Sequence, residues 1–415
     1  MDKNGLFSFC GPACYDEINQ GVYRIHKVMK AMALGEITFI QDRRKIIMTS
    51  YEKVEKAMQC VPLKDQSEIP IFPHILTWAG TVAGVPQSKI ITDCDAWLGA
   101  MEKTFDEIGN PDLCMPQHPK TIIFSMSMPV RRPGFELPEG ELYQFVEKPQ
   151  FEEDEYEKIL QMGWQNWYAM YMMRIQNPPM TDPQQYMDFW EETNQAGAKI
   201  AQFLAKRGIA PIFHIADFPI FDLLSMIRSM EPFIFDLYDN PDPIMDILNK
   251  SQPIEDERNI QILKAIGGNR IGRYAMRSSA TFMSPDMFDE YVWPVLKDSI
   301  MRFWNAGIRC VLHCDAEWLP ILDRFLELPK TSVSFEFDGV TDIVKAYEII
   351  GGWHSLRGDV PATMFAYGTP DDVREYCAGL IDKIGTKGGF ILGSGCEVPL
   401  NAKVECVKAM MEFGR

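Results

Sequence analysis

The sequence predicts an α/β protein folded as a closed (β/α)8 TIM barrel. The main observation is that short apolar runs alternate with helical patterns from residue 208 onward, repeating about every 25–40 residues, as in parallel βαβ units. A chain of 415 residues is long enough for such a barrel as one unit. No Gly-x-Gly-x-x-Gly follows any predicted strand, so a doubly wound open sheet is the weaker alternative.

The composition is that of a globular protein and limits its ligands. Lys and Arg number 41 against 58 Asp and Glu, for a net charge of −17, which argues against nucleic acid as a partner. No run approaches the roughly 18 apolar residues of a membrane span, and the N-terminus lacks the pattern of a signal peptide. The ten cysteines are scattered, so we expect reduced thiols and a cytoplasmic protein without membrane contact.

The first part of the chain predicts a helical extension followed by the first barrel strands. Residues 16 to about 60 have helical spacing, and 69–76 has the pattern of a short buried strand. Residues 93–108 form an amphipathic helix capped by Asp93. The apolar run Thr121–Met128 is a candidate second strand.

These patterns suggest three regions. We expect an N-terminal helical extension over 1–68 and a barrel over 69–415, with a helical insertion at about 130–207. Within the insertion, 162–176 is crowded with Met, Trp and Tyr. It is either a buried helix face or a lid over a flat apolar ligand or partner.

The second half of the chain supplies the remaining units. Helices are expected after each strand, over 219–238, 241–265, 285–305, 317–328, 341–350, 370–384 and 401–413. The expected strands or extended segments are 210–215, 273–282, 308–312, 331–337, 354–360 and 389–393.

Reacting groups of such barrels lie where strands end at the C-terminal face. This rule selects candidate residues by their position alone and does not depend on any sequence motif. They are His214, Asp217, Arg277, Ser278, His313, Cys314, Asp315, Glu336, Asp338, Asp359, Ser394, Cys396 and Glu397.

The most informative string is Val-Leu-His-Cys-Asp-Ala-Glu-Trp at 311–318. His313 and Asp315 are two apart, so on a strand they point to the same side, and Cys314 points to the other. The last strand ends in a Gly-Ser-Gly turn that presents Cys396. One imidazole, one carboxylate and one thiolate would leave an open position on a catalytic zinc. The alternative is an ordinary packed histidine beside inert thiols.

Several segments together resemble the uroporphyrinogen decarboxylase superfamily, in the branch that includes corrinoid-dependent methyltransferases. The resemblance covers about 205–415 well, weakens over 69–150, and is absent at the extreme N-terminus. The family fold is a (β/α)8 barrel. The matching segments are 213–224, 232–242, 282–294, Leu-His-Cys-Asp (312–315), Gly-Asp-Val-Pro-Ala (358–362), 367–373 and Gly-Phe-Ile-Leu-Gly-Ser-Gly-Cys-Glu-Val-Pro (389–399).

The resemblance implies a zinc site and a separate corrinoid protein as partner. Methyltransferases of this branch hold zinc with a His-x-Cys-Gly string and a late Cys, which fall here on His313 and Cys396. The family's middle Cys falls on Asp315, a harder ligand that would leave zinc more Lewis acidic. Cys314 and Glu317 stay as alternative ligands.

Decarboxylases of the superfamily carry an N-terminal arginine-rich motif that holds porphyrinogen carboxylates. This sequence has nothing like it. A metal-free decarboxylase is therefore a weak alternative, as is a barrel that binds without turnover.

The sequence therefore predicts a methyltransferase that exchanges methyl between a small molecule and the cobalt of the corrinoid. We favour a methylated donor such as a methoxylated aromatic, in an O-demethylation. The alternative is transfer to a thiol acceptor. Direction and oligomeric state, including a homodimer, are left open. Glu336, Asp338 and Asp359 are candidate acids or groups that support the ligands, and His214, Arg277 and Trp318 are candidate substrate contacts.

Overall fold

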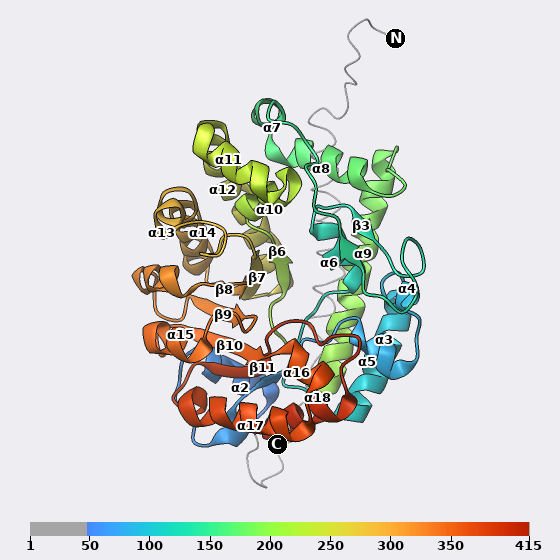
Figure 1. Cartoon of the computed structure of the whole chain (residues 1–415), viewed down its shortest axis with the longest axis vertical. Helices are drawn as coiled ribbons and strands as arrows, with labels where there is room; N and C mark the ends of the chain where they lie inside the picture. Colours follow the sequence, from blue (N-terminus) through green and yellow to red (C-terminus); the bar gives the residue numbers. More distant parts are fainter. Residues whose placement is uncertain (1–47, 415) are drawn as a thin grey trace, which may run out of the picture.

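The computed structural model describes residues 48–414. The part of the predicted helical segment 16 to about 60 that precedes residue 48 therefore lies outside the described residues, and the proposed division at residue 68 stays a prediction. Within the described part, a ring of helices surrounds a central parallel sheet (Figure 1). None of the described helices is both long and apolar enough to cross a bilayer.

Seven strands pair in parallel in the order β1-β11-β10-β9-β8-β7-β6. A second pair, β2 with β5, is also parallel. The strands are β1 (Ile71–Phe72), β2 (Leu113–Cys114), β5 (Ala210–Pro211), β6 (Ile215–Asp217), β7 (Arg270–Ala275), β8 (Arg309–Cys314), β9 (Val333–Phe337), β10 (Ser355–Val360) and β11 (Phe390–Ser394).

Two local features close this sheet into a barrel. Asp112 N donates to Ile71 O at 3.1 Å, which joins β2 to β1. β5 and β6 are two pieces of one strand, interrupted at 212–214, which pairs with β2 at its start and β7 at its end. The predicted (β/α)8 barrel is therefore confirmed.

The outer layer consists mostly of α-helices that follow the strands. The helices are α3 (Trp78–Ala83), α4 (Gln87–Ile90), α5 (Cys94–Ile108), α10 (Ile220–Arg228), α11 (Met230–Asp239), α12 (Asp242–Ile266), α13 (Pro285–Met287), η2 (Phe288–Val292), α14 (Trp293–Asn305), η3 (Leu319–Glu327), α15 (Ile343–Ile350), α16 (Ala362–Tyr367), α17 (Pro370–Leu380), η4 (Ile381–Gly385), α18 (Val404–Met411) and η5 (Glu412–Gly414). The Asp93 cap of α5 is present, because its carboxylate accepts from two backbone N–H groups of the first turn.

A long excursion separates β2 from β5. It contains α6 (Pro119–Ser125), a hairpin of β3 (Val130–Arg131) and β4 (Gln144–Phe145), and helices α7 (Glu155–Met162), α8 (Trp164–Ile175) and α9 (Pro183–Arg207). In α8 the residues Trp164, Trp167, Tyr171 and Met172 are buried and Met170 is exposed, so the aromatic stretch is chiefly a packing face.

The prediction of a strand at Thr121–Met128 is wrong. His118 caps a helix there by accepting from Lys120 N, and Pro119 occupies the first helical position, where its missing N–H costs nothing. The second barrel strand is β2 instead, a two-residue element too short for a pattern to reveal.

The helix α2 (Ser50–Met58) lies across the N-terminal ends of the barrel strands, next to the η1 turn (Gln66–Glu68). Lys53 pairs with Asp112 at 3.5 Å, and Glu55 pairs with Arg270 at 3.8 Å and Arg309 at 3.7 Å. These contacts cover the end of the barrel opposite to the strand ends that carry the candidate site.

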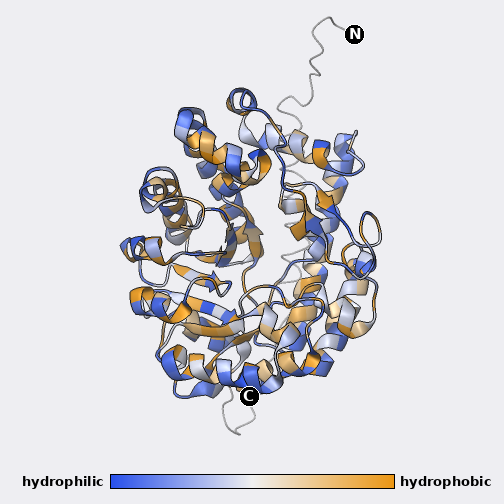
Figure 2. Cartoon of the chain, viewed as in Figure 1, coloured by the Kyte–Doolittle hydropathy of each residue, from blue (hydrophilic) through white to orange (hydrophobic). Residues whose placement is uncertain are grey.

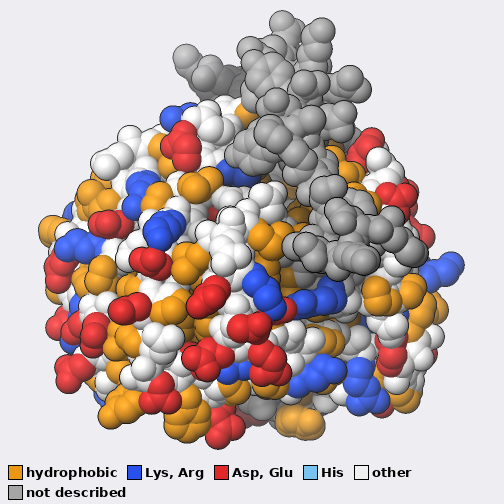
Figure 3. Space-filling model, turned by 90° about the horizontal axis from the view of Figure 1, so that it is seen from above, with side chains coloured by type: hydrophobic (Ala, Val, Ile, Leu, Met, Phe, Trp, Pro, Cys, Tyr) orange, Lys and Arg blue, Asp and Glu red, His pale blue; other side chains and the backbone are white. Residues whose placement is uncertain are grey.

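The core is one continuous apolar cluster that runs from the strands to the inner faces of the helices. In Figure 2 the outer helices carry both hydrophobic and hydrophilic residues, as expected for elements with one buried face. On the face seen in Figure 3, acidic, basic and hydrophobic side chains are interspersed over the described part.

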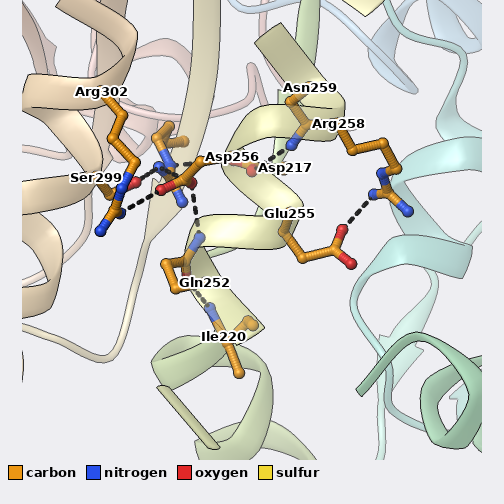
Figure 4. A network of polar contacts seen from close by, with 10 residues as sticks. Asp217, Ile220, Gln252, Glu255, Asp256, Arg258, Asn259, Ser299 and Arg302 are labelled. Carbon is orange, nitrogen blue, oxygen red and sulfur yellow. Dashed lines mark hydrogen bonds and ion pairs between the residues drawn. The ribbon is translucent and has the colours of Figure 1, made fainter. Parts of the chain in front are cut away.

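A buried polar network fastens β7 to the helices outside it (Figure 4). Arg273 is fully buried and pairs with Asp217 at 3.1 Å and Asp256 at 3.2 Å. Asp256 also accepts from Gln252 at 2.9 Å and from Arg302 at 2.9 Å. Because these charges compensate one another, β7 is held in place without an unpaired ion in the core.

We therefore expect Asp256→Asn to destabilise the fold by about 3–5 kcal/mol, because it leaves the Arg273 guanidinium buried with less compensation. Urea unfolding measures this loss. The exposed Asp246–Lys250 pair, 2.7 Å apart, offers a control. Asp246→Asn should cost below about 0.5 kcal/mol, and equal losses for the two variants would contradict this account.

Candidate functional site

A row of polar side chains crosses the barrel interior near the C-terminal ends of the strands. Tyr274 of β7, His313 of β8, Glu336 of β9 and Arg357 of β10 are register partners from strand to strand. All four are buried. Parallel pairing therefore brings residues that are distant in sequence into one layer.

Glu336 is the centre of this layer. Its Oε1 lies 3.1 Å from His313 Nδ1 and 3.9 Å from His74 Nδ1, and the same carboxylate forms an ion pair with Arg357. Glu336 is only 2% exposed. One buried carboxylate thus faces two imidazoles and a guanidinium. Since Nδ1 of His313 is directed at Glu336, its Nε2 is directed elsewhere.

The structure brings the other two predicted metal ligands, Asp315 and Cys396, to the ring of His313. His313 Nε2 lies 3.1 Å from Asp315 Oδ1, and the Cys396 side chain hydrogen-bonds the same ring. Burial alone would lower the pKa of His313, but attraction to Asp315 and the contact with Cys396 raise it well above its usual range. Burial likewise opposes ionisation of Asp315, and His313 reverses this and lowers its pKa.

These side chains touch one another without forming a preassembled ligand group. Among residues 48–414, no set of three or more His, Cys, Asp or Glu side chains has the arrangement of a metal site. The two alternative ligands are in different surroundings. Cys314 is the last residue of β8 and fully buried. Glu317 accepts from Leu319 N at 2.8 Å, at the start of η3.

Asp338 and Trp318 shape the loop that carries Asp315. Asp338 accepts from Ala316 N at 2.8 Å and from Val340 N at 2.9 Å. Trp318 donates from Nε1 to Asp315 O at 2.9 Å and is fully buried. Trp318 was predicted to contact substrate, but its buried ring instead positions the backbone of Asp315.

Asp359 faces away from the cluster. It accepts from Tyr376 of α17 at 2.7 Å. Burial raises the pKa of Asp359 to about 6, although the Tyr376 hydrogen bond opposes this shift. Its contacts place it between β10 and the outer helix.

Arg277 and His214 also lie apart from the predicted ligands. Arg277 forms an ion pair with Glu147 of the excursion, with one contact of 2.9 Å. His214 N donates to the carbonyl of Arg270, the first residue of β7, so His214 lies near the opposite end of that strand. Burial, with the nearby Arg270 charge, lowers the pKa of His214 to about 4.

Four residues at or near the site were not selected by the rule that reacting groups follow the ends of strands. Tyr274 and Arg357 lie inside strands, His74 follows Pro73 after β1, and Tyr143 comes from the irregular excursion. The sequence signal for Arg357 is a charged residue in the middle of the buried strand Ser355–Val360. Both ring nitrogens of His74 are buried without a hydrogen-bond partner.

Comparison with known proteins assigns the chain to a family. The family model described as uroporphyrinogen decarboxylase (URO-D) matches residues 188–415, from α9 to the end of the chain. The chain belongs to the uroporphyrinogen decarboxylase family.

A search of solved structures supports the fold of this family member. A methyltransferase from Methanosarcina mazei aligns with a TM-score of 0.60 at 15% identity, over 88% of this chain and 98% of that one. Dispersin B aligns with a TM-score of 0.31 at 12% identity over 52% of this chain and 76% of its own, which is too low to carry an argument. No curated protein matches the sequence.

The site geometry predicts which thiols react in the native protein. Cys396 is partly exposed, whereas Cys310 and Cys314 are buried, and burial raises the pKa of Cys310 to about 12. We expect iodoacetamide to modify Cys396 at least about tenfold faster than either buried thiol. Peptide-resolved mass spectrometry measures the rates, with a Cys396→Ser variant to confirm the assigned peptide. Equal rates in native protein would refute this placement.

Proposed function

We propose that this member of the uroporphyrinogen decarboxylase family is a zinc-dependent methyltransferase. It would move a methyl group between a small methylated substrate and the cobalt of a corrinoid carried by a separate protein. The observation that carries the proposal is the meeting of His313 from β8 with Cys396 from the end of β11, beside Asp315.

The chemistry of these side chains fits zinc. Nitrogen, oxygen and sulfur are its usual protein ligands, and in a tetrahedral site the ligand atoms are about 3.3 Å apart. The 3.1 Å between His313 Nε2 and Asp315 Oδ1 is close to that spacing. A carboxylate on the far nitrogen, as Glu336 provides for His313, is the usual support of a metal-bound histidine.

The roles of the chain's own residues follow from these contacts. His313, Asp315 and Cys396 would hold the metal. Bound zinc would stabilise negative charge on the heteroatom that exchanges methyl. The Glu336 carboxylate, 3.1 Å from His313 Nδ1, would favour a proton on that nitrogen, so that Nε2 could offer its lone pair. Arg357 compensates the Glu336 charge, and Trp318 and Asp338 fix the loop of Asp315.

The direction we favour is from donor to corrinoid. In a transfer to the corrinoid, the heteroatom of the donor would keep the electron pair of the broken bond to methyl. An oxygen leaving group needs stronger polarisation than a sulfur one, and a carboxylate ligand leaves zinc harder than a thiolate would. The ring of Tyr274, whose centroid is 5.5 Å from that of His313, would offer an aromatic surface to a methoxylated aromatic.

Decarboxylation of a porphyrinogen is a poorer fit to the site. Such a substrate carries several carboxylates that need free cations. Arg277 is already paired with Glu147, and Arg357 with Glu336. The similarity to the Methanosarcina mazei methyltransferase, which is a likeness of fold, is consistent with the transferase proposal.

Metal analysis and methyl transfer test the proposal together. We expect one zinc per chain, and methylcobalamin formation from 2-methoxyphenol and cob(I)alamin kept reduced by titanium(III) citrate. The variants His313→Ala and Cys396→Ala should each lose bound zinc and methyl transfer. Glu336→Gln should weaken zinc binding about 10–100-fold.

Cys314→Ala is the matched control, because Cys314 is the sequence neighbour of His313 on the opposite strand face, and it should retain zinc and activity. Full activity in zinc-free His313→Ala would end the zinc hypothesis. Methyl transfer only from methylcobalamin to 2-mercaptoethanesulfonate would favour the thiol acceptor, and metal-free porphyrinogen turnover would favour the decarboxylase. Zinc or probe binding without any turnover would indicate a non-catalytic barrel.

A further inference from the structure

One side chain from outside the barrel reaches the candidate site. Tyr143 precedes β4, whose hairpin with β3 is held by the Val130–Phe145 and Arg131–Gln144 pairs. Its hydroxyl donates to Glu397 Oε2 at 3.5 Å. Cys396 and Tyr274 are the next groups that act electrostatically on this phenol. Because Glu397 directly follows Cys396 in the chain, this bond places Tyr143 of the excursion beside the candidate site.

The Tyr143 hydroxyl is a donor that is only weakly engaged. Burial, together with the neighbouring Glu397 carboxylate, raises the pKa of Tyr143 well above its usual range, so the phenol keeps its proton. Its 3.5 Å bond is at the limit of a hydrogen bond. Tyr171 and Tyr156 of the same excursion make bonds of 2.6 Å and 2.8 Å. A ligand could therefore replace the Glu397 contact at little cost.

The acceptor Glu397 is itself fixed in place. Thr77, which follows β1, donates to Glu397 Oε1 from its backbone N at 2.8 Å and also from its hydroxyl. The other carboxylate oxygen is left for Tyr143. Glu397 is therefore held by Thr77, and its position does not depend on the Tyr143 hydroxyl.

A second contact holds the segment of Tyr143 against the barrel. Arg277, after β7, forms an ion pair with Glu147, and Glu147 also accepts from Ser229 Oγ at 2.9 Å and Met230 N at 3.0 Å. Burial opposes ionisation of Glu147, but the Arg277 and Met230 hydrogen bonds outweigh it and lower its pKa to about 2. The pair therefore stays charged at neutral pH.

We propose that Tyr143 is a substrate-facing residue supplied by the excursion, and that the Arg277–Glu147 pair positions it over Cys396. If the proposed function holds, the Tyr143 hydroxyl donates a hydrogen bond to the substrate heteroatom that exchanges methyl. The excursion would thereby take part in substrate selection, because it supplies a hydrogen bond that favours an oxygen acceptor over an apolar group.

The cover over Cys396 is tested without any activity. The rate of Cys396 alkylation by iodoacetamide is measured in the full-length protein and in three variants. Glu147→Gln and Tyr143→Ala should each raise the rate about tenfold, because each removes part of the cover. Glu157→Gln, an exposed charge change on α7, is the matched control and should leave the rate unchanged. Unchanged rates in both test variants would overturn the proposal.

The hydrogen bond is tested by kinetics. Tyr143→Phe removes only the hydroxyl, so zinc content and Cys396 alkylation should stay as in the parent protein. Its kcat/KM for 2-methoxyphenol should fall about tenfold or more. Tyr156→Phe, which removes a hydroxyl bonded to Asp236 away from the site, should leave it unchanged. An unchanged kcat/KM in Tyr143→Phe would overturn the assigned contact.

Failure of the proposed function is distinguishable from failure of this inference. Added Zn²⁺ should slow Cys396 alkylation if Cys396 is a ligand, whereas the Glu147 and Tyr143 variants report the cover alone. If the parent protein transfers no methyl, both the function and the hydrogen bond are overturned, and the alkylation rates still decide whether Tyr143 covers the site.

Discussion

The candidate site depends on how one buried carboxylate is compensated. Glu336 is surrounded by His313, His74 and Arg357 in a place where an unpaired charge would be very costly. Because the partners come from β8, from β10 and from the segment that follows β1, the contact requires a closed barrel with the correct register. The same carboxylate lies 3.1 Å from Nδ1 of His313, while Nε2 of that ring lies 3.1 Å from Asp315 Oδ1. Barrel closure and site geometry are thus linked through Glu336.

Family membership explains the fold, whereas the residues of the site determine the chemistry. Membership of the uroporphyrinogen decarboxylase family accounts for the barrel, but chemistry depends on the residues placed at the strand ends. Here Arg277 is paired with Glu147, and Arg357 inside the barrel is paired with Glu336. His313, Asp315 and Cys396, the proposed ligands, lie close to one another. The proposal of a metal site rests on these side chains rather than on family membership.

Much of the barrel and the core of the site could be predicted from sequence, because both follow from local periodicity. Alternating strands and helices predicted the (β/α)8 fold, and the two-residue spacing of His313 and Asp315 predicted a shared face. That Cys396 would reach them followed from the rule that strand ends meet at one mouth. Their roles as metal ligands stay predictions.

What could not be predicted depends on partners that are distant in sequence. Arg277 has a strand-end position, but only the fold shows that Glu147, 130 residues away, engages it. Trp318 follows the ligand string, yet aromatic packing against Phe288 and Phe325 removes its ring from the mouth. Tyr143 belongs to a segment without regular periodicity. Cross-strand register, rather than any motif, brings Arg357 next to Glu336.

X-ray absorption spectroscopy at the zinc edge tests the central claim most directly. In the zinc-loaded protein the account predicts one sulfur scatterer at about 2.3 Å with nitrogen or oxygen scatterers at about 2.0–2.1 Å. The sulfur shell should vanish in Cys396→Ser. A zinc shell without sulfur in the parent protein, or a sulfur shell that survives in Cys396→Ser, would contradict it.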